Sequence, residues 1–187
     1  MALAADDAPA TESAEARVRV LEAHVSLWQP GIVCLQELGG AASALGALRE
    51  RIRALGYEAD YQAGEVARSG MDAHRRGGVM VAWKQRLFRP AEGGGKAGPR
   101  RRHGSALLTE AVLDALAEER TISGPCAAAL REYVGRRALA VHLVRRRGPR
   151  TNEPIFACCA YVPASAPEAV RAGFIRAAAE ALRLLGA

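Results

Sequence analysis

Four short apolar runs limit the architectures that this chain can adopt. They cover residues 32–35, 77–83, 137–144 and 155–162, and a Gly, Pro or charged residue precedes each of them. Runs of this length, rich in branched residues, predict strands that are buried or half-buried in a sheet. A weaker alternation predicts one more strand over residues 57–62. Each run is far shorter than the ~18 apolar residues that a membrane span needs.

Helical patterns precede, separate and follow these runs. Apolar residues recur at intervals of three and four in four segments: residues 12–28, 45–55, 106–120 and 166–185. This spacing places the apolar side chains on one face of a helix. Strands that alternate with such helices predict an α/β fold in which helices cover sheets. Residues 121–135 fit neither pattern, and the Gly-rich, basic residues 92–104 predict an exposed loop.

Composition favours one globular domain and is compatible with an anionic partner. The chain has 187 residues, of which half are apolar, and a formal net charge of +6. The excess charge is arginine, gathered at residues 75–76, 100–102, 136–137 and 145–147. Guanidinium groups suit phosphate oxygens, so nucleic acid is the first partner to consider. A GC-rich genome, which favours Arg, Ala and Gly codons without any ligand, explains the same composition equally well.

The cysteines and the N-terminus bear on location. Cys34, Cys126, Cys158 and Cys159 form no CxxC pair and no zinc spacing. Residues 1–10 carry two aspartates and lack the basic and apolar regions of a signal peptide. We therefore expect an intracellular protein, nuclear or cytoplasmic rather than secreted, with no membrane partner.

Three segments resemble one known family. They are Gln-Pro-Gly-Ile-Val-Cys-Leu-Gln-Glu over residues 29–37, Gly-Gly-Val-Met-Val-Ala-Trp over residues 77–83, and Ala-Tyr-Val-Pro over residues 160–163. Together they resemble the endonuclease/exonuclease/phosphatase superfamily. Tyr-x-Pro at a strand end resembles its branch of abasic-site and retroelement endonucleases. The resemblance implies the DNase I-like fold, a four-layer α/β/β/α sandwich.

The resemblance also implies a site and a cofactor. Family members hydrolyse phosphate esters with a bound divalent cation, Mg²⁺ or Mn²⁺, and Glu37 matches the metal-binding glutamate at the end of a buried strand. A hard cation prefers such carboxylate oxygens. Tyr161 matches the tyrosine that contacts the scissile phosphate. Each residue also has a plainer interpretation, Glu37 as a solvent-exposed residue after a strand and Tyr161 as a half-buried aromatic.

Other parts of the family pattern are missing. The family's first strand supplies an asparagine, but the single Asn of this chain is Asn152. The family's later Gly-Asp-x-Asn and Ser-Asp-His motifs have no counterpart after Tyr161. We therefore expect residues 1–11 to be a flexible leader and residues 12–187 an incomplete domain with an insertion at 91–135. The sandwich should be partial, without its first and last strands, and a partner chain would cover an exposed sheet edge.

These gaps leave the function open among three readings. The first is a metal-dependent phosphodiesterase or endonuclease domain acting on nucleic acid, truncated and of weak or no activity alone, because catalytic groups act as a unit. The second is a non-catalytic, nucleic-acid-binding remnant of a retroelement endonuclease. The third is a structural fragment with no selected function.

Overall fold

The computed structural model describes residues 10–38, 42–66, 75–76, 78–91, 104–106, 108–146, 154–162 and 166–186. The chain divides into two compact units, residues 1–30 and 31–187. The first unit contains helix α1, Ala10–Trp28, which begins two residues before the expected start. The predicted leader at residues 1–11 lies outside the described residues up to position 9. Within the described residues, no helix is both long and apolar enough to cross a membrane.

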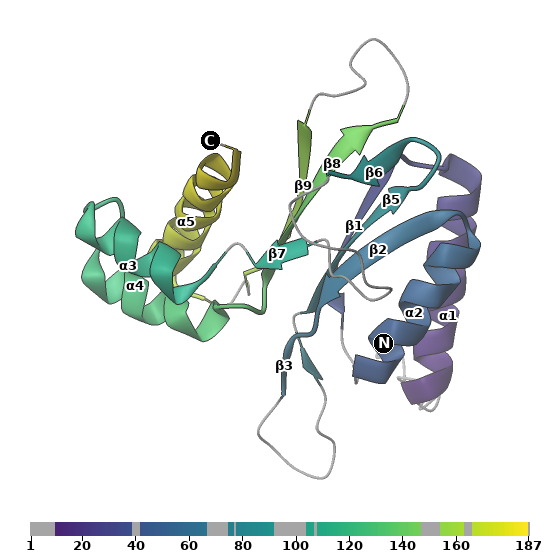
Figure 1. The fold of residues 1–187 in the computed structure, drawn as a ribbon. Coiled ribbons are helices and arrows are strands. Elements are labelled where there is room, and N and C mark those ends of the chain that lie inside the picture. Colours follow the sequence, from purple (N-terminus) through teal and green to yellow (C-terminus); the bar gives the residue numbers. More distant parts are fainter. Residues whose placement is uncertain are drawn as a thin grey trace. The chain divides into compact units, whose positions relative to one another are not determined.

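The first sheet of the second unit is antiparallel, with strand β5 in its centre. β5, Gly78–Lys84, pairs with β1, Ile32–Leu38, on one side and with β2, Tyr57–Gln62, on the other (Figure 1). β5 is buried along its whole length, as its apolar sequence predicts. β1 was expected to be buried but is half-buried, because among the described strands it lies at the edge of this sheet.

The second sheet is built around strand β8, Ala138–Arg145, which forms a hairpin with β9, Pro154–Ala160. Two short strands, β6 (Phe88–Pro90) and β7 (Gly104–Ala106), pair with the other edge of β8. A separate small ladder joins β3, Glu65–Val66, to β4, Arg75–Arg76. The predicted strands therefore all form, and two of them make the long hairpin of this sheet, with β8 in its centre and β9 at its edge.

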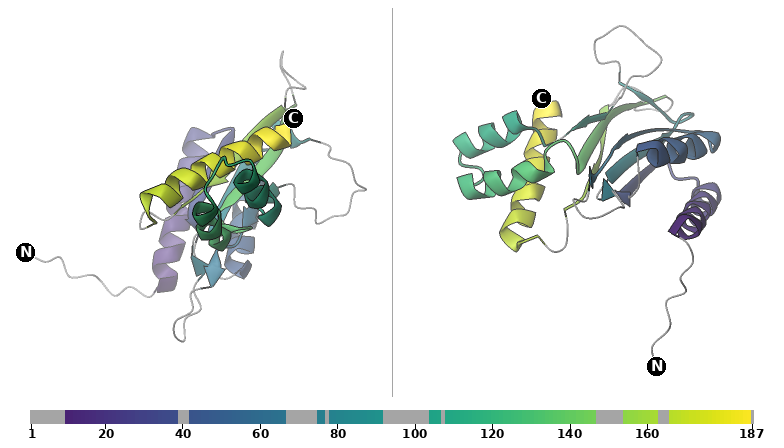
Figure 2. Two further views of the ribbon diagram at one scale, coloured as in Figure 1. Left: turned by 90° about the vertical axis from the view of Figure 1, so that its left-hand side faces the viewer. Right: turned by 90° about the horizontal axis from the view of Figure 1, so that it is seen from below.

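Helices cover the outer faces of both sheets. α2, Ala42–Ala54, packs against β2, while α3 (Glu110–Glu118), α4 (Gly124–Leu130) and α5 (Glu168–Gly186) gather on the far face of the second sheet (Figures 1 and 2). A short 3₁₀ helix, Arg131–Tyr133, follows α4. The four layers of an α/β/β/α sandwich are thus present.

The helix expected over residues 106–120 begins later, at Glu110. Thr109 caps it by accepting a hydrogen bond from the Val112 amide at 3.2 Å. Residues 104–106 are instead held in β7 by pairing with β8, a long-range contact that overrides the local helical pattern. Residues 121–135, which fitted no pattern, contain α4, capped by Ser123. The predicted loop at 92–104 lies outside the described residues except for Gly104.

Two apolar cores hold the layers together. Between the sheets, the inward row of β5 meets the inward row of β8; the residues are Val79, Val81, Trp83, Leu139, Val141 and Leu143. On the other face of the second sheet, Ala138 and Ala140 pack under the helices with Leu113, Leu130 and Phe174. Alternate residues of β8 therefore serve different cores, as the period of two in a strand requires.

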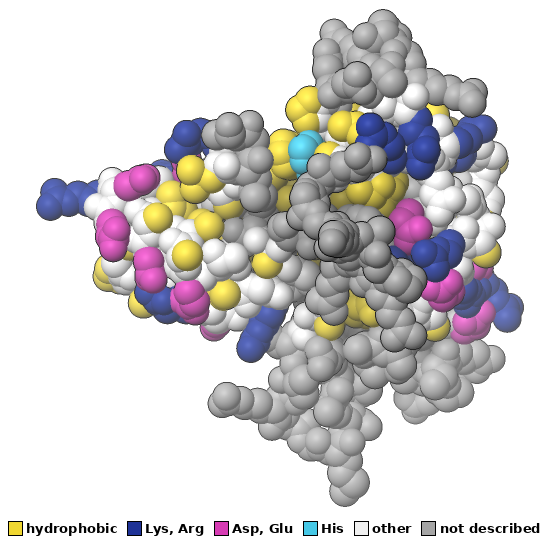
Figure 3. All heavy atoms as spheres, viewed as in Figure 1, with side chains coloured by type: hydrophobic (Ala, Val, Ile, Leu, Met, Phe, Trp, Pro, Cys, Tyr) yellow, Lys and Arg dark blue, Asp and Glu magenta, His cyan; other side chains and the backbone are white. Residues whose placement is uncertain are grey.

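Basic side chains gather at one end of the sheets. Figure 3 shows Lys and Arg side chains over β6 and its surroundings. An open pocket of about 590 Å³ lies there, lined by Gln85, Arg86, Leu87 and Arg146. Arg146 is held by a hydrogen bond from its Nε to the Phe88 carbonyl at 3.1 Å. The pocket is therefore a basic recess where β5 ends and β8 ends.

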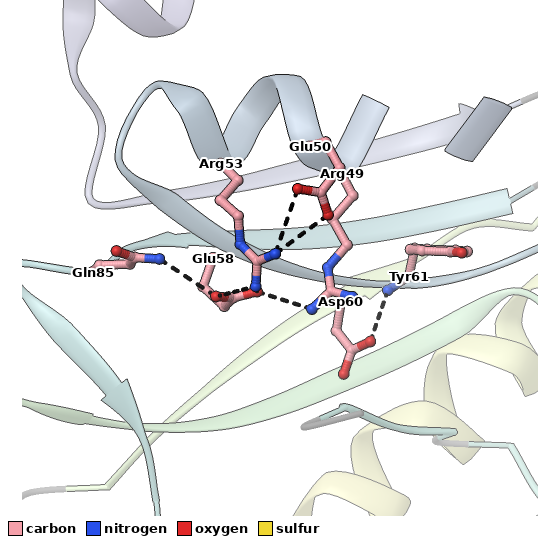
Figure 4. Close-up of polar contacts among 7 residues, drawn as sticks. All are labelled: Arg49, Glu50, Arg53, Glu58, Asp60, Tyr61 and Gln85. Carbon is pink, nitrogen blue, oxygen red and sulfur yellow. Dashed lines mark hydrogen bonds and ion pairs between the residues drawn. The ribbon is translucent and has the colours of Figure 1, made fainter. Parts of the chain in front are cut away.

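A charged network ties α2 to β2. Glu58 accepts hydrogen bonds from Arg49 at 2.9 Å and from Arg53 at 3.1 Å, and Gln85 adds a longer one at 3.4 Å (Figure 4). Burial raises the pKa of the Glu58 carboxyl, but the hydrogen bonds and charges of Arg53 and Arg49 outweigh it, so the net pKa is lowered.

Replacing Glu58 by glutamine should lower the unfolding free energy by about 1 kcal/mol near neutral pH, the upper range for a partly exposed ion pair. A carboxyl whose pKa is lower in the folded chain stabilises it above its ordinary pKa of about 4.3, and this stabilisation is lost as pH falls through the folded value. The stabilities of both proteins, measured by urea titration, should therefore converge as the pH falls below the lowered pKa of Glu58 in the folded chain. Glu50→Gln, at a carboxylate 63% exposed, is the matched control and should change stability little. A gap between Glu58→Gln and the native chain that persists undiminished in acid would contradict this assignment.

Candidate functional site

Glu37 stands at an irregularity of β1. Leu35 pairs with Met80 and Leu38 pairs with Gly78, so Gln36 and Glu37 together oppose the one residue between, Val79. This is a β-bulge, and Glu37 adopts the left-handed conformation, with φ of +54°. In a regular strand two successive side chains point to opposite faces. Here the bulge turns both toward the second sheet.

The edge of β1 lies along the edge of β9. Four contacts advance in step along the two strands, so the strands run parallel; they join Cys34 to Cys158, Leu35 to Cys159, Gln36 to Ala160 and Glu37 to Tyr161. Each contact uses a side chain, as in the 2.8 Å hydrogen bond from Gln36 Nε2 to the Ala160 carbonyl. We call this line of contacts the β1–β9 seam. It aligns two residues that are 124 positions apart in the chain.

Glu37 and Tyr161, the two site residues predicted from the sequence, meet at the end of this seam. The Tyr161 hydroxyl donates a hydrogen bond to Oε1 of Glu37. Glu37 is exposed and Tyr161 is half-buried. The hydrogen bond to the carboxylate raises the pKa of Tyr161, burial and the charge of Glu37 add to the rise, and the positive charge of Arg137 opposes it. The phenol is therefore held protonated, with its proton directed at the carboxylate.

Arg137 is a third member of the site, and the sequence reasoning assigned it no role there. Its side chain is buried, at 7% exposure, and its guanidinium lies 5.1 Å from the ring centre of Tyr133 and 5.6 Å from that of Tyr161. The Arg137 carbonyl also accepts a hydrogen bond from the Tyr161 amide at 2.8 Å. The feature that could have placed Arg137 in the site is its position directly before β8, opposite the end of β9 in the hairpin.

The site combines three kinds of group: an exposed carboxylate, a phenol and a guanidinium. Within the described ranges, no group of three or more His, Cys, Asp or Glu is arranged to hold a metal ion. Mg²⁺, however, is commonly held by one or two carboxylates, with water and substrate phosphate completing its shell. A carboxylate has about four acceptor positions, and the phenol occupies one, so Glu37 fits a single-carboxylate ligand for a hydrated cation.

His142 lies away from this site. Its ring stacks on Phe156, with ring centres 4.5 Å apart, and its Nε2 is buried without a hydrogen-bond partner. It points to the opposite face from Val141 and Leu143, as the strand pattern predicts. His24 is in α1, and His74 and His103 lie outside the described residues.

The contact between Tyr161 and Glu37 predicts a shift in titration. Glu37→Gln removes the negative charge that stabilises the protonated phenol, so the pKa of Tyr161 should fall. The chain has four tyrosines, so ¹³C-tyrosine NMR, with Tyr161→Phe to assign the signal, would separate them. Glu132→Gln, at an exposed glutamate of the 3₁₀ helix, should leave the signal unchanged. An identical Tyr161 midpoint in the native chain and in Glu37→Gln would refute the contact.

Comparisons with known proteins identify the fold. The structure is similar to that of the human nocturnin catalytic domain with bound sulfate anion, with a TM-score of 0.59 and 14% sequence identity. The match covers 91% of this chain and 51% of the nocturnin chain, so this chain spans about half of that length. No protein-family model matches the sequence. No curated protein sequence matches it either. The fold is thus a partial DNase I-like sandwich, as the sequence predicted.

Proposed function

We propose that this chain is a phosphodiesterase-type domain that holds Mg²⁺ through Glu37 and acts on nucleic acid. The observation that carries the proposal is the meeting of Glu37 and Tyr161 across two different sheets. The sequence segments that resemble the family place these same two residues in one site. Their roles, as metal ligand and phosphate contact, are part of the proposal.

The bound cation, Tyr161 and Arg137 would have different roles at a bound phosphate. When bound, the cation would polarise a phosphoryl oxygen and stabilise charge that develops on it. The Tyr161 hydroxyl, which donates a hydrogen bond to Glu37 in this structure, would donate one to a phosphate oxygen of the substrate. Arg137, stacked on the ring, would fix the orientation of the phenol and place a positive charge near the phosphate.

The expected activity of this chain alone is weak or absent. The described residues bring one carboxylate to the site, and no larger ligand cluster. Removing single members of a catalytic set costs nearly as much as removing several, so a partial set retains little rate enhancement. The sulfate bound by the nocturnin domain has the tetrahedral shape and charge of a phosphate, which supports an oxyanion as the ligand of this fold.

Metal binding offers a direct test. Mn²⁺ titration, followed by the relaxation of water protons, should show a site that weakens by about tenfold or more in Glu37→Gln. Glu132→Gln should bind Mn²⁺ as the native chain does. Equal affinity in the native chain and in Glu37→Gln would remove Glu37 from the proposal.

Cleavage assays test the reaction itself. Mg²⁺-dependent cleavage of plasmid DNA, abasic-site DNA and single-stranded RNA should be slow or undetectable with the native chain. Any cleavage that occurs should disappear in Glu37→Gln. Robust cleavage by Glu37→Gln would contradict the role of Glu37 in catalysis. Robust cleavage by the native chain that Glu37→Gln abolishes would contradict the expectation that this chain alone has weak activity.

A non-catalytic nucleic-acid-binding role is the second candidate. The basic pocket lined by Arg86 and Arg146 favours this role, because it lies away from the candidate catalytic site. The β1–β5 register places this pocket and Glu37 at opposite ends of the first sheet. Binding through phosphate contacts should weaken with salt, with a slope of about −0.7 per contacted phosphate on single strands. Arg86→Ala with Arg146→Ala should flatten that slope, while Glu37→Gln should not. A flat slope for the native chain would exclude this role.

Two further expectations remain predictions. An intracellular location, nuclear or cytoplasmic, follows from the cysteine pattern. A partner chain at a sheet edge follows from the missing strands. Among the described strands, β2 has one edge without a backbone ladder, whereas the edges of β1 and β9 that lack a ladder lie along each other at the seam.

A further inference from the structure

Three of the four cysteines meet at the β1–β9 seam. Cys34 belongs to β1 and is exposed, whereas Cys158 and Cys159 belong to β9 and are half-buried and buried. The fourth, Cys126, lies apart from them in α4. All four are free thiols.

The two faces of β9 separate the pair of cysteines next to Cys34. Cys159 belongs to the core between the sheets, whereas Cys158 packs against the core under the helices. Cys34 shares the inter-sheet side, because its register partner Val81 and its neighbour in alternation, Ile32, both contact that core. Cys34 and Cys159 are therefore diagonal neighbours on the same side of the seam.

Hydrogen bonds hold these two sulfurs close. The Cys159 thiol donates to the Leu35 carbonyl at 3.1 Å, and Cys34, the residue before Leu35, has its sulfur 3.6 Å from the carbonyl oxygen of Cys158, the residue before Cys159. Interaction with the neighbouring Cys159 thiol lowers the pKa of Cys34 to about 7, against the opposing effect of burial. The same interaction, together with burial, raises the pKa of Cys159, and burial raises the pKa of Cys158 to about 11. Cys34 thus supplies an exposed thiolate near neutral pH, with a protonated thiol beside it.

We propose that Cys34 and Cys159 form a redox-active dithiol that hydrogen peroxide converts to a disulfide joining β1 to β9. The Cys34 thiolate attacks one peroxide oxygen, the O–O bond breaks, and Cys34 becomes a sulfenic acid with release of hydroxide. The Cys159 sulfur then attacks the Cys34 sulfur and displaces its hydroxyl. The two thiol protons, together with the two hydrogens and two oxygens of the peroxide, leave as two waters, so the thiols are oxidised by two electrons and the peroxide is reduced by two.

The disulfide would lie next to the candidate site. Cys34 precedes Glu37 by three residues, and Cys159 precedes Tyr161 by two. A covalent bond there would clamp the two sheets at the seam and close a long loop of the chain, which stabilises a fold by restricting its unfolded state. The proposal needs neither metal nor nucleic acid, so it stands or falls separately from the proposed function.

The test uses the full chain carrying Cys126→Ser and Cys158→Ser, which leaves Cys34 and Cys159. Hydrogen peroxide should remove both thiols, lower the mass by two hydrogens and link the Cys34 peptide to the Cys159 peptide within one chain. The melting temperature should rise, and dithiothreitol should reverse both changes. With Cys159 also replaced by serine, Cys34 should stop at a sulfenic acid that dimedone traps. Cys159→Ala provides the same arm if serine disturbs the buried position, and circular dichroism checks that each variant folds.

Three outcomes would overturn the proposal. One is a link from Cys34 to Cys158, rather than to Cys159, in the native chain. Another is a bond formed only between two copies of the chain. The third is survival of both thiols in folded protein under peroxide that oxidises the urea-unfolded chain.

Discussion

Trp83→Ala is expected to lower the unfolding free energy by about 3–5 kcal/mol, the usual cost of truncating a buried tryptophan. Trp83 is 1% exposed and lies in β5, the central strand of the first sheet, where it faces the second sheet. Its loss would open a cavity between the two sheets, and the strands on either side are held by backbone ladders that restrict collapse into it. Urea denaturation followed by far-ultraviolet circular dichroism would measure the change.

Two variants calibrate this result. Trp83→Phe keeps an aromatic ring in the core and should cost less, about 1–2 kcal/mol. Ile175→Ala removes a side chain of α5 that is 66% exposed and should change stability by less than about 0.5 kcal/mol. If Trp83→Ala cost no more than Ile175→Ala, the two sheets could not be packed face to face as described.

Gly78→Ala is expected to lower the unfolding free energy by about 2–3 kcal/mol through overpacking. A Cβ at Gly78 would lie 2.7 Å from the Leu38 carbonyl oxygen, 3.1 Å from that of Gln62 and 3.2 Å from the Gly64 amide nitrogen. All three atoms are backbone, so no side chain can rotate out of the way. Because Leu38 directly follows Glu37, the displacement should also alter the Tyr161 signal in ¹³C-tyrosine NMR.

The chain contains a matched control for this substitution. A Cβ at Gly46, inside α2, meets nothing within 4 Å. Gly46→Ala should therefore stabilise the chain by up to about 1 kcal/mol, the difference in helix propensity between the two residues. Equal effects of Gly78→Ala and Gly46→Ala would show that β1 and β2 do not approach β5 at Gly78 as closely as described.

Elements with a strong local pattern were predicted correctly. The run predicted at residues 77–83 is apolar because its strand, β5, is buried on both faces, and the 3.6-residue period of α5 reflects one face turned to a sheet. Glu37 and Tyr161 were nominated by short segments that resemble a family, and the structure brings them into contact. Their chemical roles stay predictions.

Features that depend on distant residues were not predictable. The half-exposure of β1 comes from its place at a sheet edge, which no local pattern encodes. The bulge at Glu37 appears only when β1 is paired residue by residue with β5. Arg137 looked like one of many clustered arginines, and its place in the site depends on the β8–β9 hairpin register. In each case the deciding partner is remote in the chain.

Because the candidate site lies at the β1–β9 seam, its geometry depends on how the two sheets are aligned. Its carboxylate belongs to one sheet and its phenol to the other, and no backbone ladder connects them. If one sheet slid along the other by a single residue, every ladder would survive, yet the two groups would separate by about 3.3 Å. A small shear could therefore dismantle the site while leaving the secondary structure, as circular dichroism reports it, unchanged.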